Sequence, residues 1–105
     1  MDLTELKKRA AAQPENILHQ FSLGQALFEQ QDWKAAIGPL QKCAENRDDW
    51  MMARILLGKC YFQLEKWPEA RAYFEAALRL AREQQHEDPE TEITEFIRIL
   101  DEKSS

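Results

Sequence analysis

One block of the sequence occurs twice, and the spacing between its copies restricts the fold more than any other feature. The second copy follows the first after 34 residues, without insertion or deletion. Five residues are identical between the copies: Leu23 and Leu57, Gly24 and Gly58, Phe28 and Phe62, Trp33 and Trp67, and Ala36 and Ala70. A fixed period of this length is typical of helix pairs that stack side by side.

The small residues of the repeated block indicate where the two helices of a pair approach each other. Glycine and alanine carry little or no side chain, so they allow two helix backbones to pack closely. We therefore expect Gly24 to meet Ala36 at the first crossing. The equivalent contact in the second pair joins Gly58 and Ala70.

Hydrophobic spacing and capping signals divide the chain into six helices within one domain, residues 1–105. The units are a leading helix at 3–12, a first helix pair at 17–50, a second pair at 51–84 and a last helix at 88–102. Asp32 is expected to cap the second helix of the first pair, and Asp88 the last helix, since an aspartate at this position accepts a backbone hydrogen bond. Asp48 or Asp49 has the same expected role ahead of the second pair.

Gly38 and Pro39 fall inside the helix that is expected to begin at Trp33. A proline within a helix removes one backbone hydrogen bond and crowds the preceding turn. Because the hydrophobic spacing continues in phase on both sides of Pro39, we expect a bend and not a break. A functional hinge is the alternative interpretation.

The formal net charge of -5 is unevenly distributed along the chain. Residues 83–105 carry eight Asp or Glu against one Arg and one Lys, which leaves +1 for residues 1–82. This distribution offers no basic footprint for nucleic acid or for an anionic membrane. No apolar run reaches the ~20 residues that span a bilayer, and no secretory signal begins the chain, so we expect a cytoplasmic protein.

No set of residues in the sequence indicates catalysis, a metal or a cofactor. His19 and His86 belong to different helices, and Cys43 and Cys60 lack metal-ligand spacing. A glycine-rich phosphate loop and a nucleophile elbow are both absent from the sequence. We therefore expect no enzyme activity, no cofactor and no metal site.

The repeated block resembles the tetratricopeptide repeat family, whose pattern is W-x2-L-G-x2-Y, then A-x3-F, then P. The second copy matches this pattern at Leu57, Gly58, Tyr61, Ala70 and Phe74. The chain departs from it at Gln20 and Arg54 in place of tryptophan, and at Asp48 and Arg82 in place of the closing proline. The resemblance implies an all-α superhelix of two stacked helical hairpins, with a leading half-repeat helix and a C-terminal capping helix.

The resemblance also implies a concave groove lined by the first helix of each repeat. The groove positions correspond to Leu18, Phe21, Gln25, Phe28, Glu29, Met52, Ile55, Lys59, Phe62 and Gln63. Helical periodicity alone gathers the apolar members of this set on one face of each helix. We expect Phe21 and Ile55 to anchor an apolar segment of a partner, while Gln25 and Lys59 orient it.

The expected function is therefore that of a protein-interaction module, an adaptor or scaffold that binds an apolar peptide or helix of another protein in its groove. The alternative is an assembly unit, for example a homodimer, in which self-association or the chain's own last helix buries the groove. The last helix is the feature that discriminates between the two interpretations, because it carries an apolar stripe that must be buried somewhere. The stripe comprises Ile93, Phe96, Ile97 and Leu100.

Overall fold

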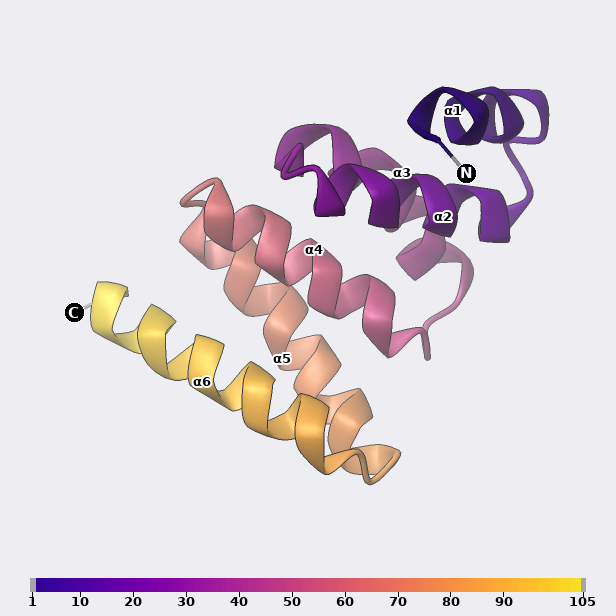
Figure 1. The fold of residues 1–105 in the computed structure, drawn as a ribbon. Coiled ribbons are helices and arrows are strands. Elements are labelled where there is room, and N and C mark those ends of the chain that lie inside the picture. Colours follow the sequence, from indigo (N-terminus) through magenta and orange to yellow (C-terminus); the bar gives the residue numbers. More distant parts are fainter. Residues whose placement is uncertain (1, 105) are drawn as a thin grey trace.

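The computed structural model describes residues 2–104, and the regular structure within them is entirely helical (Figure 1). The helices are α1 Leu3–Ala12, α2 Ile17–Glu29, α3 Trp33–Asn46, α4 Met51–Gln63, α5 Trp67–Glu83 and α6 Glu87–Ser104. They confirm the expected all-α fold of two helical hairpins flanked by one further helix at each end.

The helices stack in the order in which they occur along the chain. The pairs α2 with α3 and α4 with α5 pack most extensively, and α1 and α6 cover the two ends of the stack (Figure 1). In Figure 1, α2 and α4 lie in front of α3 and α5, and the two chain termini lie at opposite ends. The result is an elongated body of 43 × 28 × 20 Å.

Only one of the three N-caps expected from the sequence is observed. Asp32 caps α3 as expected, because its side chain accepts a hydrogen bond from the Ala35 amide at 3.3 Å. The expectation for Asp48 or Asp49 was wrong, since Trp50 precedes α4 and provides no side-chain cap. The Asp49 carboxylate lies instead 3.5 Å from Nε of Arg47, an ion pair that competes with capping.

The expectation for Asp88 was also wrong, because α6 begins one residue earlier, at Glu87. The Glu90 amide donates to the carbonyl of His86, so the first turn of the helix already includes Asp88 and Pro89. Within that turn, the negative charge of Asp88 still favours the helix N-terminus through the helix dipole.

The crossing glycines lie in tight contacts, but their nearest neighbours are not the alanines that we expected. A β-carbon added to Gly24 would lie 2.7 Å from Cγ of Leu40. One added to Gly58 would lie 2.8 Å from Cε1 of Phe74. A large side chain one helical turn beyond the expected alanine therefore fills the space that each glycine leaves.

Two clusters of buried side chains form the core. The first joins the first hairpin to α4, and it includes Leu27, Leu40, Cys43, Leu57 and Cys60. The second joins α4 and α5 to α6, and it includes Ile55, Phe74, Ala77, Ile93 and Leu100. The last helix is therefore part of the core and not an appendage to it.

The helix α3 continues without a break through Pro39, as the hydrophobic spacing predicted. The preceding residue, Gly38, is exposed, and a β-carbon added there would meet no atom within 4 Å. Unlike Gly24 and Gly58, this glycine is not required by any contact within the described residues.

We therefore expect Gly38→Ala to raise the free energy of unfolding by about 1 kcal/mol, because alanine has the higher helix propensity and restricts the unfolded chain. Urea denaturation followed by circular dichroism measures this change. Ala72, the equivalent residue of the second repeat, offers the reciprocal control, since Ala72→Gly should lower stability by a similar amount. A loss of stability in Gly38→Ala would contradict this interpretation of Gly38.

Candidate functional site

The expected groove residues lie on α2 and α4, and α6 runs beside α4 (Figure 1). These three helices begin on the same side of the molecule and run in similar directions, with α4 between α2 and α6 (Figure 1). The sequence left open whether the last helix covers the groove. In the structure it covers one half and leaves the other open.

The covered half consists of the α4 residues Ile55, Lys59 and Phe62, which face α6. Ile55 is only 3% exposed and shares a buried cluster with Ile93 of α6, so it is a core residue. The ring of Phe62 meets the ring of Phe96 edge-on, with 5.1 Å between centroids. Gln63, at the end of α4, is exposed.

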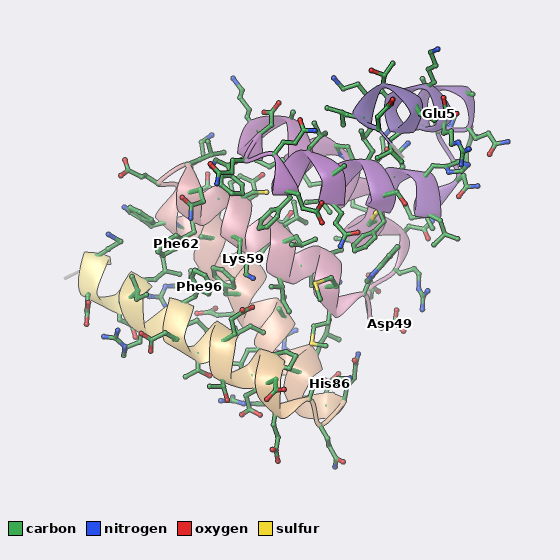
Figure 2. The ribbon with its side chains drawn as sticks, viewed as in Figure 1. Glu5, Asp49, Lys59, Phe62, His86 and Phe96 are labelled. Atoms are coloured by element: carbon green, nitrogen blue, oxygen red, sulfur yellow. The ribbon has the colours of Figure 1, made fainter. Side chains whose placement is uncertain are left out.

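Lys59, which we expected to orient a ligand, is held by α6 instead. Its Nζ lies 3.1 Å from Oε1 of Glu92 and 6.0 Å from the centroid of the Phe96 ring. Figure 2 shows Lys59, Phe62 and Phe96 gathered between α4 and α6. The ion pair neutralises the only cation among the ten expected groove residues.

The open half contains the most exposed large apolar side chains of the described residues. Leu18 is 68% exposed and Met52 is 47% exposed. They occupy equivalent positions, 34 residues apart, at the starts of α2 and α4, two helices that contact each other. We refer to Leu18, Phe21 and Met52 together as the open patch.

Aromatic contacts fix the remaining groove side chains of α2. The ring of Phe21 stacks on that of Trp50, with 4.7 Å between centroids and 26° between planes. The ring of Phe28 meets that of Trp33 edge-on at 5.0 Å. Both phenylalanines are half-buried, whereas Gln25 and Glu29 are exposed.

A pocket of about 300 Å³ adjoins the open patch, at the boundary between the open and covered halves. It is lined by Met52, Ile55, Lys59, Asp88, Pro89 and Glu92. Lys59 and Glu92 pair with each other, whereas Asp88 forms no ion pair within residues 2–104. The pocket therefore combines an apolar floor with one net negative charge.

Three residues of this region were not predicted as part of a binding site, namely Asp88, Pro89 and Glu92. All three belong to α6, and nothing in the local sequence places that helix beside α4. The apolar stripe of the last helix was the one available signal, because it required a surface to cover. It did not specify which surface.

Both cysteines of the chain are free and buried in the core. Burial raises the pKa of the Cys43 thiol to about 11 and that of Cys60 to about 12, so both thiols are neutral near pH 7 and poor nucleophiles. Within residues 2–104, no three His, Cys, Asp or Glu side chains converge as metal ligands would. No helix in that range is both long and apolar enough to cross a membrane.

A family model matches residues 4–77 of the chain and is described as "Anaphase-promoting complex, cyclosome, subunit 3". The match covers most of α1, the whole first hairpin and α4, and it ends within α5. No curated protein matches the chain.

Solved structures with the same arrangement of helices include a solution structure of protein BPP2914 from Bordetella parapertussis. It has a TM-score of 0.80 at 23% identity, over 98% of this chain and 90% of that one. A structure of MamA titled MSR-1 has a TM-score of 0.70 at 21% identity, over 98% of this chain and 67% of that one. A second MamA structure, titled AMB-1, has a TM-score of 0.73 at 22% identity, over 95% and 66% of the two chains. At these identities the likeness establishes the fold alone.

Proposed function

Since this chain belongs to the tetratricopeptide repeat family, a generally non-enzymatic fold for protein interaction, we propose that it binds a segment of a partner protein through its open patch. The observation that carries the proposal is the exposure of Leu18 and Met52 on neighbouring helices, beside a pocket. Burying one such side chain contributes about 1.5–3 kcal/mol, so a ligand that covers both gains substantial affinity.

The open patch also has the rigidity that an anchor site requires. Phe21 is held against Trp50 by ring stacking, so its exposed edge is fixed before a ligand arrives. A preorganised side chain loses little conformational entropy on binding. Ile55, which is buried in the core, does not contribute an anchor, so the expected pair Phe21 and Ile55 is replaced by Phe21, Leu18 and Met52.

The pocket beside Met52 indicates the chemistry of the bound segment. Because Asp88 forms no ion pair with any described residue and Glu92 is shared with Lys59, a lysine or arginine side chain is the complementary group. The partner segment is therefore apolar with at least one basic residue, and not simply apolar. The amine of Lys59 does not orient this segment, because it already pairs with Glu92 of α6.

The proposal is tested with two short helical peptides, one of leucine and lysine and the other of leucine and glutamate. We expect the lysine peptide to shift the amide resonances of Leu18, Met52 and Asp88 in the ¹⁵N-labelled protein. Leu18→Gln combined with Met52→Gln should weaken binding at least about tenfold, since two exposed apolar contacts are lost. The variant should remain folded because both side chains are exposed.

Gln63→Ala serves as the matched control, because Gln63 is an exposed groove position outside the open patch. Equal binding by the native protein and the Leu18, Met52 double variant would contradict the proposal. Light scattering after size exclusion tests the alternative assembly unit. A dimer that the same double variant abolishes would assign the open patch to self-association instead.

A further inference from the structure

The outer side of α3 carries two residues, Gly38 and Pro39, whose presence in a helix the stability of the protein does not explain. Gly38 occupies an exposed position in the interior of α3, where glycine costs about 1 kcal/mol relative to alanine. Pro39 follows it, and a proline in a helix interior costs about 3 kcal/mol. The second repeat forms the same helix with Ala72 and Tyr73 at these positions, so the fold does not require the pair.

Two pockets flank Gly38 on opposite sides of α3. One, of about 380 Å³, lies toward α1 and is lined by Lys7, Ala10, Ala11, Pro14, Gln20, Leu23, Gly38, Pro39 and Lys42. The other, of about 450 Å³, lies toward the α4–α5 turn and is lined by Lys34, Ile37, Gly38, Gln41, Tyr61, Leu64 and Lys66. Of the described residues, Gly38 alone lines both pockets, and it has no side chain to stand between them, so we refer to this position as the saddle.

Four lysines surround the saddle, although the body of the protein has almost no net charge. Lys7 and Lys42 line the first pocket, and Lys34 and Lys66 line the second. None of the four forms an ion pair with a carboxylate within residues 2–104, and neither pocket is lined by a described Asp or Glu. The four lysines therefore have no ion-pair partner within residues 2–104, although Glu69 lies near the second pocket, where burial and then the charges of Tyr73 and Glu69 raise the pKa of the Tyr61 hydroxyl.

We propose that this outer face of α3 is a second protein-binding site, which takes an acidic segment of a partner that crosses α3 at Gly38. The missing side chain allows the partner backbone to approach the helix closely. One apolar side chain of the partner enters each pocket, against Leu23 and Pro39 on one side and Ile37 and Leu64 on the other. Carboxylates of the partner pair with the four lysines.

The shape of the site favours a peptide over an anionic membrane. Each pocket is large enough for a side chain, and the second holds an oriented polar pair, with Nε2 of Gln41 3.1 Å from the hydroxyl oxygen of Tyr61. A membrane surface offers nothing that fills two separate pockets. A second copy of the chain is also a poor occupant, because the apolar stripe of its acidic helix α6 is buried, with Ile93 and Leu100 at 0% exposure.

The leucine–glutamate peptide described above is the probe. We expect it to shift the amide resonances of Gly38, Gln41 and Leu64, while the leucine–lysine peptide leaves these three unchanged. Lys34→Glu combined with Lys42→Glu should weaken binding about tenfold or more through charge reversal. Gly38→Trp should do the same by filling the saddle, and it should fold because no atom lies within 4 Å of a β-carbon there.

Matched controls distinguish a loss of binding at this site from general effects of a reversed charge or an added bulky side chain. Lys8→Glu removes an exposed lysine outside both pockets, and Ala72→Trp adds the same bulk at the equivalent position of α5. Both should bind the glutamate peptide as the native protein does. The Leu18, Met52 double variant should also bind it normally, which distinguishes this site from the open patch.

Three outcomes would overturn the proposal. The first is native affinity in both the lysine double variant and Gly38→Trp. The second is the absence of any shift at Gly38 at the highest soluble peptide concentration. The third concerns a membrane. If the native protein binds phosphatidylserine vesicles but not the peptide, and the same variants lose the vesicle binding, the face would be assigned to a membrane.

Discussion

Replacing Phe74 with alanine is expected to lower the free energy of unfolding by about 3–5 kcal/mol, the usual cost of removing a large buried ring. The side chain is fully buried and fills the crossing beside Gly58, where the ring lies 2.8 Å from the position of an added β-carbon. It also stacks on Phe96, with 4.7 Å between centroids. Its loss therefore leaves a cavity where α4, α5 and α6 meet.

Urea denaturation measures the effect, and Phe96→Ala provides the comparison. Phe96 is only partly buried, so its removal should cost less than that of Phe74. Equal costs would show that the stacked pair, and not the crossing at Gly58, determines the stability of this region. A cost below about 1 kcal/mol for Phe74→Ala would contradict the described packing.

The second large effect is expected for Ile93→Asp, which should lower the free energy of unfolding by more than about 3 kcal/mol. Ile93 is fully buried and belongs to the cluster that joins α6 to Ile55 and Phe74. A carboxylate there loses its hydration without gaining a partner. We expect α6 to detach or the whole domain to unfold, and binding of a hydrophobic dye to the exposed cluster reports either event.

Thr94→Asp is the matched control, because it places the same charge on the next residue, which is exposed. It should change stability by less than about 0.5 kcal/mol. If Ile93→Asp were equally harmless, α6 would not be part of the core. The two predictions together test whether the second cluster depends on the last helix.

Much of the fold could be predicted from the sequence because its signals are local. The fixed period places Leu23 and Leu57 on equivalent helix faces, and helical spacing with Pro14 and Asp32 marks where helices end and begin. The details that failed depend on neighbours elsewhere in the chain. The competing ion pair of Asp49 and the register of Gly58 against Phe74 arise only once the helices are packed.

The candidate site was less predictable than the fold. Periodicity gave Leu18 and Met52 the same face, but Ile55 and Lys59 share that periodicity and are covered by α6. The difference between them depends on how the last helix turns back, which no local pattern encodes. The role of the ten groove residues in binding, the single-domain assignment and the cytoplasmic location stay predictions.

The stacking of Trp50 on Phe21 gives the protein a built-in optical reporter. Trp33 and Trp67 occupy equivalent positions and pack edge-on against Phe28 and Phe62, whereas Trp50 has no counterpart in the other repeat and adjoins the open patch. With the other two tryptophans replaced by phenylalanine, the fluorescence of the molecule would come from a single indole. Its emission would then distinguish a ligand on the open patch, which would cover that indole, from one seated on α3, which would not.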